Sequence, residues 1–417
     1  VKTGLKPSEL SKLINKWAWD HSPHNTGGRD ESMLPPNFTV RDFQSNVAAS
    51  KSFLTFAQAG CGSGKSLAAY MWAYQWCERF ANHGRTNFRL FVCLPTTGTT
   101  TEHFKDYALE SGIDASLTHS RSSIDLQTIS ETASQEEANA ADADTAEAAR
   151  IALNTARDKI ESLALWSTPL VVTTADTVLG LMSNARRAIY SIPAIMSSVI
   201  VFDEIHAFDG QMFGHLLVFL KNFPRLPVLL MTASLSDERL TAIKRVRPDL
   251  HPVSGPPEFE TLERYVIINS MTDEAMWRTV QECVLESRRV LWVCNRVEWA
   301  NEIYRACRER FRDQMAESAI NVYHSRLRYK DRSLRHRRVI DHFKTEGNAA
   351  ILVATQVAEM SLDLSADLLV TDIAPISSLI QRMGRLNRRS MPDDPQPPKL
   401  AIVRALPNGE FNVERPY

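Results

Sequence analysis

The residues with the clearest chemistry form a glycine-rich segment, AGCGSGKS, between positions 59 and 66. It follows an apolar run and precedes the helix-forming run LAAYMWAYQW. In such a loop the backbone N–H groups surround phosphate oxygens, and the following helix N-terminus adds its dipole. Lys65 then reaches the β- and γ-phosphates, and the Ser66 hydroxyl serves Mg²⁺. The segment predicts a nucleotide site that contains Gly60, Cys61, Gly62, Ser63, Gly64, Lys65 and Ser66.

Two acidic residues, Asp203 and Glu204, directly follow another apolar run in the sequence VIVFDEIHAFD. A phosphate-binding loop needs such a partner at the end of a neighbouring strand, where Asp203 holds Mg²⁺ through its water shell. Glu204 is then placed to orient and deprotonate the attacking water. The alternative is that both carboxylates only cap the following turn. His206 is placed to link this site to the strand that carries Thr232 and Ser234, although a lone histidine is often a surface or capping residue.

A third group of candidates lies near the end of the chain, in the stretch QRMGRLNR that ends at Arg388. On the helix that we predict there, Arg382, Arg385 and Arg388 fall on roughly one face, which suits a cluster directed at an anion. The alternative is a surface salt-bridge face, and Gly384 argues against it because a helical glycine costs about 1 kcal/mol and usually has a packing reason. We predict Arg385 and Arg388 as arginine fingers and Gln381 as a contact of the γ-phosphate or its water. Such arginines are worth about 10³–10⁵ in rate, so hydrolysis would depend on closure of the part that supplies them.

Parallel strands are needed to position these groups. Short apolar runs rich in β-branched residues alternate with amphipathic stretches of helical length, which is typical of parallel α/β sheets covered on both faces. The runs are 53–59, 90–95, 170–175, 199–204 and 228–233, and then 265–269, 290–295, 320–325, 350–355, 368–373 and 400–403. The sequence therefore predicts the α/β class, with two tandem domains that have parallel central sheets and helices on both faces.

The domain boundaries follow from the same pattern. We predict an N-terminal helical lead-in over 1–36, a first lobe over 37–250, a linker rich in proline and charge over 251–263, and a second lobe over 264–417. An acidic insertion at about 120–160 is interpreted as a solvated helical or partly disordered element in preference to a partner-binding one.

The composition excludes several classes of protein. The 417 residues include 48 Lys plus Arg and 49 Asp plus Glu, with 44% hydrophobic residues, which is neither a disordered nor a histone-like composition. No apolar stretch approaches the ~20 residues of a membrane span, and no signal pattern opens the chain. The six dispersed cysteines favour reduced thiols over zinc ligands or disulfides. We therefore expect a cytoplasmic protein with no membrane partner.

The ordered motifs resemble those of superfamily 2 DExH helicases. They are AGCGSGKS, LPTT, TTAD, DEIH, TAS, ATQVAEMSLDL and QRMGRLNR, and Ala59 in the first loop position fits the helicase form of the phosphate loop. DEIHAFD and EMSLDLSADLLVTDIAPISSLIQRMGRLNR look most similar to the CRISPR-associated helicase-nuclease of type I systems. The resemblance extends from Gln44, which looks like the adenine-reading Q motif, to Arg388, and covers a helicase core only.

This resemblance implies two RecA-like lobes that bind ATP and Mg²⁺ between them and single-stranded DNA across their upper faces. Family members move 3′ to 5′ on DNA after recruitment by a crRNA-guided surveillance complex. Asp363 is implied near the ribose or the γ-phosphate. The implied nucleic-acid contacts are Pro95, Thr96, Thr97, Thr173, Thr174, Thr355 and Gln356, because short hydroxyl and backbone donors hold phosphates without reading bases. Arg326 and Arg328, in a basic run beside a strand end, are expected to line the DNA path in preference to a solvated face.

One departure from the family concerns its HD nuclease domain, which needs a His-Asp dipeptide. No such dipeptide occurs in this sequence, so we expect the nuclease as a domain or subunit outside this segment. Three alternatives to a DNA helicase stay open: a DExH helicase that acts on RNA, a module that uses ATP binding as a conformational switch, and a pump that moves on duplex DNA without separating strands. The intact set of Lys65, Glu204 and arginines argues against the switch, because binding alone needs no water-activating carboxylate.

Overall fold

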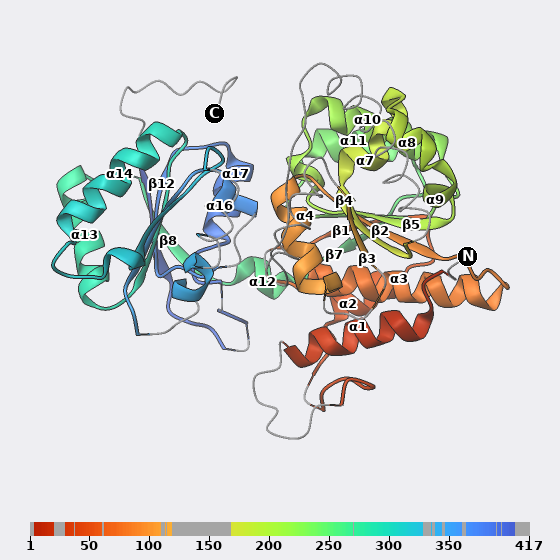
Figure 1. Ribbon diagram of the computed structural model, residues 1–417, viewed down its shortest axis with the longest axis horizontal. Coiled ribbons are helices and arrows are strands. Elements are labelled where there is room, and N and C mark those ends of the chain that lie inside the picture. The colour runs from red at the N-terminus through yellow and green to blue at the C-terminus, as the bar shows by residue number, and fades with distance from the viewer. Residues whose placement is uncertain are drawn as a thin grey trace, which may run out of the picture. The chain divides into compact units, whose positions relative to one another are not determined.

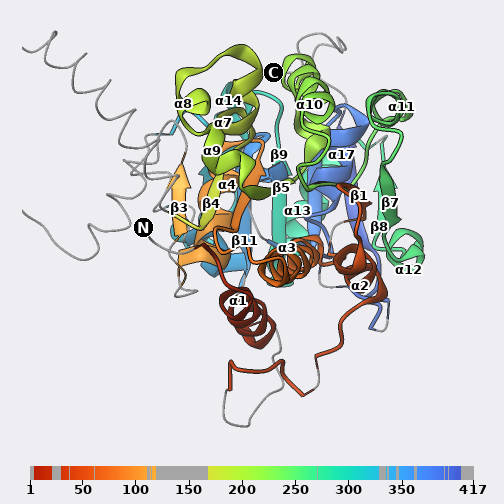
Figure 2. The same ribbon diagram turned by 90° about the vertical axis from the view of Figure 1, so that its right-hand side faces the viewer.

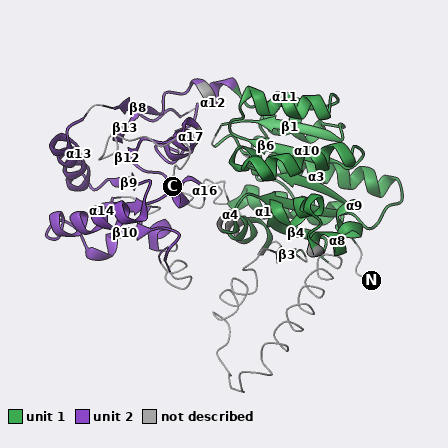
Figure 3. Ribbon diagram, turned by 90° about the horizontal axis from the view of Figure 1, so that it is seen from above, with its two compact units in different colours: residues 1–256 green, residues 257–417 purple. Residues whose placement is uncertain are grey.

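A computed structural model of the chain describes residues 4–20, 30–36, 38–60, 62–109, 113, 115–118, 168–269, 271–327, 335, 338–343, 347–360, 364–388, 390–392 and 394–404. The chain divides into two compact units, Val1–Pro256 and Pro257–Tyr417, which are coloured separately in Figure 3. The predicted acidic insertion at 120–160 lies outside the described residues.

The first unit is built on a seven-stranded parallel sheet with the strand order β3-β4-β2-β5-β6-β1-β7. Its strands are almost entirely buried because both faces are covered, and this explains their nearly continuous apolar sequences. The strands are β1 (Leu54–Gln58), β2 (Arg89–Leu94), β3 (Ala115–Thr118), β4 (Leu170–Thr174), β5 (Ser198–Phe202), β6 (Val228–Thr232) and β7 (His251–Ser254).

Alternate residues of each strand enter two separate cores, as the two-residue period of a strand requires. Val199 and Val201 of β5 face one core, whereas Ile200 and Phe202 face the other. The first core is closed by α1 (Pro7–Asp20), α2 (Asp42–Ala49) and α3 (Lys65–Asn82), and the second by α7 (Ala175–Leu179), α9 (Ile192–Met196), α10 (Gly210–Asn222) and α11 (Asp237–Val246). These two helical layers lie on opposite faces of the sheet in Figure 1 and, seen from the side, in Figure 2.

The second unit has a six-stranded parallel sheet with the order β10-β11-β9-β12-β13-β8. Its strands are β8 (Tyr265–Ile268), β9 (Arg289–Val293), β10 (Ile320–Tyr323), β11 (Ala350–Ala354), β12 (Leu368–Asp372) and β13 (Lys399–Arg404). The helices α13 (Asp273–Leu285) and α14 (Val297–Arg310) cover one face, and α16 (Val357–Met360) and α17 (Ile376–Met383) cover the other. The predicted α/β class, with two parallel sheets and helices on both faces, is confirmed.

The structure differs from the predicted boundaries at two places. The start of the predicted linker, 251–263, is strand β7, which pairs with β1, and the division falls after Pro256. Only Val253 of β7 is buried, so the sequence of this edge strand looks like a linker. The predicted lead-in, 1–36, contains α1, whose residues Leu10 and Leu13 are part of the first core. It therefore belongs to the first unit.

Candidate nucleotide site and nucleic-acid contacts

The phosphate loop connects the end of β1 to the start of α3. Gly62 and Gly64 have φ angles of 82° and 85°, in the left-handed region that glycine adopts without strain. The Ser63 hydroxyl donates to the carbonyl of Gly60 at 2.8 Å, and Lys65 Nζ donates to the carbonyl of Ala59 at 2.8 Å. The loop thus folds around the lysine at the N-terminus of an 18-residue helix. Cys61 lies outside the described residues.

Gln44, the predicted adenine reader, contacts this loop directly. Its amide Nε2 donates to the carbonyl of Gly64 at 3.3 Å, and its Oε1 accepts from the backbone N–H of Arg41 at 3.0 Å. The Arg41 guanidinium donates in turn to the carbonyl of Gly62 at 2.7 Å. The sequence analysis missed Arg41, whose only signal was its place three residues before Gln44. The start of α2 therefore buttresses the phosphate loop, and a contact of Gln44 with adenine stays a prediction.

The acidic pair follows β5, at the same carboxyl edge of the sheet as the phosphate loop. Asp203 is 6% exposed, and its Oδ1 accepts from the backbone N–H of Glu204 at 2.8 Å. Glu204 has a φ of 50°, a left-handed conformation that costs a non-glycine residue about 1 kcal/mol. Burial, reinforced by the negative charge of Glu204, raises the pKa of Asp203 to about 7, although Lys65 opposes the shift. A divalent cation here would offset this cost, so the carboxylates fit Mg²⁺ in their chemistry.

His206 lies between the acidic pair and the end of β6. Its Nδ1 is 3.0 Å from Thr232 Oγ1 and 3.2 Å from Glu204 Oε2. The Thr232 hydroxyl donates its single hydrogen to the carbonyl of Ser234 at 2.7 Å, so it accepts from His206 Nδ1–H. The structure thus brings together the three residues that we predicted as a coupling group.

The predicted nucleic-acid contacts of the first unit follow β2 and β4, two paired strands whose last residues, Leu94 and Thr174, are register partners. Pro95 and Thr97 flank Thr96, which is the N-cap of α4 (Thr97–His103) through Thr99 N–H. Thr173 is fully buried within β4, because this strand is covered on both faces. That burial disfavours a side-chain contact of Thr173 with a strand, whereas the other positions stay predictions.

In the second unit Thr355 and Gln356 follow β11. Thr355 is 2% exposed, and its N–H donates to the carbonyl of Tyr323 at 3.2 Å. Gln356 Nε2 donates to the carbonyl of Asn295, which follows β9, at 2.8 Å. Arg326 is exposed and pairs with Glu298 at 2.5 Å. Arg328 and Asp363 lie outside the described residues.

The predicted helix over QRMGRLNR is wrong in its second half. α17 ends at Met383 with Gly384 as its C-cap, and Asn387 has a φ of 51°. The glycine therefore ends the helix and is not a packing position within it. Arg385 and Arg388 consequently do not share a helical face with Arg382.

The side chains of this segment have defined environments. The guanidinium of Arg385 donates to the carbonyls of Ala358, at 3.2 Å, and Glu359, at 2.6 Å. The backbone N–H of Arg388 donates to Ser365 Oγ at 3.1 Å, and Gln381 is 4% exposed. The predicted fingers are thus anchored at the carboxyl edge of the second sheet, and their contact with a nucleotide stays a prediction.

Several polar residues of this edge were not predicted from the sequence. Arg382 is completely buried, although an unpaired arginine is almost never buried. The residues around it that the sequence analysis missed are Asn295, Glu359 and Asp372. The signal that was available is the position of Asn295 and Asp372 directly after or at the end of apolar runs, where functional polar residues of parallel sheets collect.

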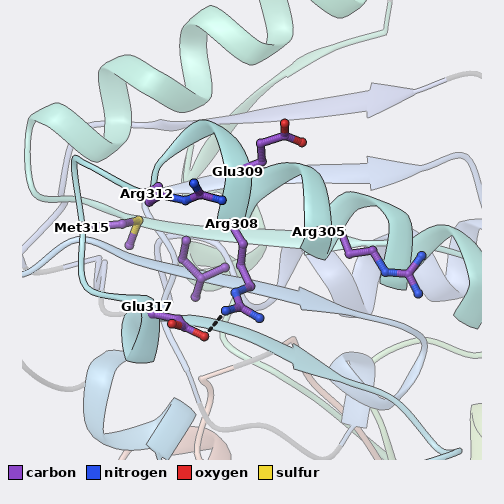
Figure 4. A pocket seen from close by; sticks show the side chains of 7 residues that line it. Arg305, Arg308, Glu309, Arg312, Met315 and Glu317 are labelled. Atoms are coloured by element: carbon purple, nitrogen blue, oxygen red, sulfur yellow. Dashed lines mark hydrogen bonds and ion pairs between the residues drawn. The ribbon is translucent and has the colours of Figure 1, made fainter.

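A cavity of ≈ 390 Å³ opens in the second unit beside α14 (Figure 4). Its lining includes Arg305, Arg308 and Glu317, and Arg308 forms an ion pair with Glu317. Ile320, the first residue of β10, also lines it, so the cavity lies at the amino end of that strand. It is therefore separate from the carboxyl edge that carries the motifs.

Among the residues that the structure describes, none of the helices has the length and apolar character of a membrane span.

Comparisons with known proteins agree with this arrangement. Residues 42–243 match the DEAD/DEAH box helicase family, and residues 286–391 match the C-terminal part of the CRISPR-associated nuclease/helicase Cas3. A putative CRISPR-associated nuclease/helicase Cas3 from Myxococcus xanthus is 42% identical over 370 residues, which cover 88% of this chain and 46% of that protein.

Two solved structures show the same fold. T. fusca Cas3 with AMPPNP superposes with a TM-score of 0.64 at 20% identity over 97% of this chain and 48% of that chain. A chain of a CRISPR RNA-guided surveillance complex in a pre-nicking state gives 0.56 at 18% identity, over 88% of this chain and 44% of that chain. These matches identify both units as RecA-like.

The fold and the motifs define a helicase of the DEAD/DEAH-box class. Within that class, the chain belongs to the Cas3 family of CRISPR-associated nuclease/helicases. It spans about half the length of the Myxococcus relative and of the T. fusca structure.

Proposed function

We propose that this chain is the ATP-driven motor of a type I CRISPR interference system, which moves 3′ to 5′ on single-stranded DNA. One observation carries the proposal: the phosphate loop, the Asp203–Glu204 pair and the His206–Thr232 contact lie at the carboxyl edge of one parallel sheet. Ligands of open α/β sheets bind at this edge. The match to the nuclease/helicase family supports the CRISPR context.

The residues of this chain divide the chemistry among them. Lys65 binds the β- and γ-phosphates, and Glu204 accepts the proton of the attacking water. Ser66 and Asp203 would hold Mg²⁺, which neutralises phosphate charge when it is bound. Arg385 and Arg388 stabilise the charge that develops on the transferred phosphoryl group, and Gln381 orients its water. Because the arginines come from the second unit and the loop from the first, hydrolysis requires closure of the two units.

The nucleic-acid partner is the second part of the proposal. Pro95, Thr96, Thr97 and Thr174 from the first unit, with Thr355 and Gln356 from the second, contact the phosphate backbone of one DNA strand. Arg326 and Arg328 line the path of that strand. A crRNA-guided surveillance complex recruits the motor, and an HD nuclease domain or subunit outside this segment cuts the unwound DNA. The fold shared with a chain of such a complex supports this recruitment.

The decisive experiment measures steady-state ATP hydrolysis with Mg²⁺, alone, with single-stranded DNA and with RNA of the same sequence. We expect stimulation by DNA and not by RNA, and loss of at least about 10³-fold of the rate in Glu204→Gln, which keeps the shape of the side chain. Lys65→Ala tests phosphate binding in the same assay. Normal hydrolysis in either variant contradicts the assigned chemistry, and stimulation by RNA alone would make the protein an RNA helicase.

Strand displacement from duplexes with a 3′ or a 5′ tail tests the direction. Displacement only from the 3′-tailed duplex is expected. Hydrolysis that DNA stimulates without displacement of either strand would instead indicate a pump that moves on DNA without unwinding it.

A further inference from the structure

Arg382 is the most completely enclosed charged residue of the second unit's carboxyl edge. Its side chain is 0% exposed, and each of its three nitrogens donates a hydrogen bond. Nη1 bonds to Thr371 Oγ1, at 2.8 Å, and to the carbonyl of Asp372, at 3.0 Å, so the guanidinium is fixed to the end of β12. Nothing in the chemistry assigned above uses this residue.

One branch of its contacts leads to the predicted arginine finger. Arg382 Nε donates to Glu359 Oε1 at 2.9 Å, and Glu359 is 7% exposed. The carbonyl of the same Glu359 accepts from Arg385 Nη2 at 2.6 Å. The position of Arg385 thus depends on a residue that Arg382 fixes through its side chain.

The other branch leads to the predicted DNA contact. Arg382 Nη2 donates to Asn295 Oδ1 at 3.0 Å, and the carbonyl of Asn295 accepts from Gln356 Nε2 at 2.8 Å. Gln356 and Glu359 also belong to one helical turn, because the Glu359 N–H donates to the carbonyl of Gln356 at 2.9 Å. A displacement of this turn therefore moves Gln356 and the carbonyl that holds Arg385 together.

We propose that Arg382 is a positioning residue that couples DNA binding at Gln356 to the placement of Arg385 for ATP hydrolysis. The inference rests on the proposed function, since it uses the roles given there to Gln356 and Arg385. A planar guanidinium suits the task, because its fixed fork reaches Glu359, Asn295 and Thr371 at once, whereas a lysine ammonium is a single point donor. Energetic coupling of this kind changes an affinity or a rate by about 5- to 150-fold.

The test compares wild type, Arg382→Lys and Glu359→Gln in three measurements: kcat and KM for ATP with and without single-stranded DNA, the Kd for DNA with and without AMPPNP, and the thermal unfolding midpoint. In both variants we expect DNA stimulation of kcat to fall by at least about tenfold, while the DNA-free rate, the KM and the Kd without AMPPNP change less than about threefold. The effect of AMPPNP on DNA affinity should disappear in parallel. Glu359→Gln keeps a hydrogen-bond acceptor for Arg382, so it probes the link without leaving an unpaired buried charge.

Arg305→Lys is the matched control. Arg305 is exposed on α14 beside the cavity of Figure 4, and the same chemical change there should leave stimulation intact. Stimulation that persists in folded Arg382→Lys or Glu359→Gln overturns the inference. So does a parallel fall of the DNA-free rate, both affinities and the unfolding midpoint, which is the result of a purely structural role. If the wild type itself shows no stimulation by nucleic acid, the proposed function is wrong, and that result is distinct from either of these.

Discussion

His206 Nδ1 and Thr232 Oγ1 lie 3.0 Å apart and join the ends of β5 and β6, which are neighbours in the first sheet. The same nitrogen is 3.2 Å from Glu204 Oε2. A change of charge or position at the catalytic carboxylate is therefore transmitted to Thr232 through one imidazole. Thr232 in turn donates to the carbonyl of Ser234, in the loop that leaves β6.

This contact predicts that ATP hydrolysis and strand movement can be separated. In Thr232→Val, which removes the hydroxyl but keeps the shape, we expect hydrolysis to stay within about threefold of wild type while the DNA displaced per ATP falls about tenfold, or 1.4 kcal/mol. His206→Ala should give the same result. The measurement combines steady-state hydrolysis with strand displacement. His215→Ala on α10 is the control, and equal losses of hydrolysis and displacement would contradict the prediction.

The phosphate loop makes a second prediction, because Gly64 has both an unusual backbone and a close neighbour. Its φ is 85°, and a Cβ atom there would lie 2.2 Å from Gln44 Nε2. Gly64→Ala should displace Gln44 and weaken ATP binding by at least about tenfold, since left-handed strain of about 1–2 kcal/mol adds to the overlap. ATP affinity is measured by competition with a fluorescent nucleotide.

Gly84 provides the matched control for this prediction. It follows α3, has a φ of 74° and has no atom within 4 Å of an added Cβ. Gly84→Ala therefore carries the backbone strain without the overlap, and it should bind ATP like the wild type. Adding Gln44→Ala to Gly64→Ala should recover part of the affinity, and a double variant as weak as Gly64→Ala would show that the overlap with Gln44 is not the cause.

The N-terminal helix makes a third prediction, which concerns the extent of the first unit. Leu13 on α1 is 3% exposed in the first core, and Trp17 stacks on Tyr107 with ring centroids 6.1 Å apart. Leu13→Ala should lower the free energy of unfolding of this unit by about 2–5 kcal/mol, as expected for a leucine removed from a packed core. Lys12→Ala, at the exposed neighbouring position, should change it by less than about 0.5 kcal/mol. Urea unfolding of both variants provides the comparison, and equal midpoints would place α1 outside the unit.

The sequence predicted the buried strands well and the edges poorly, for a physical reason. Strands such as β5 and β11 are covered on both faces, so their composition alone identifies them. β3 and β7 are the outermost strands of the first sheet, and neither was predicted. In β7 only Val253 is buried, and its exposed neighbours give the passage the composition of a loop.

The candidate site shows the same division. The phosphate loop and the acidic pair were predicted because each is a local pattern directly after a strand. The environment of Arg382 was not, because its partners Asn295, Glu359 and Thr371 come from three distant segments that only the folded sheet brings together. The helix end at Gly384 was also missed, since the same glycine fits a helix interior or a C-cap until Asn387 is seen in its left-handed conformation.

A buried histidine makes the last prediction, on the pH dependence of stability. His103 is 8% exposed, its Nε2 is 3.0 Å from the Tyr70 hydroxyl, and its ring stacks on Tyr107 with centroids 4.6 Å apart. Burial lowers the pKa of His103 from 6.5 to about 4. Between these values the unfolded chain binds a proton that the folded protein does not, so stability is complete above pH 6.5 and is lost as the pH falls toward 4.

The expected loss from this one group between pH 7 and pH 5 is about 2 kcal/mol, from 1.36 kcal/mol per pKa unit. Urea unfolding at both pH values, with wild type and His103→Gln, measures it. The glutamine keeps a polar partner near Tyr70 but binds no proton, so the variant should lose about 2 kcal/mol less than the wild type over this range. If the two proteins lost stability equally, His103 would have to carry its proton in the folded state, which its enclosure by Tyr70 and Tyr107 opposes.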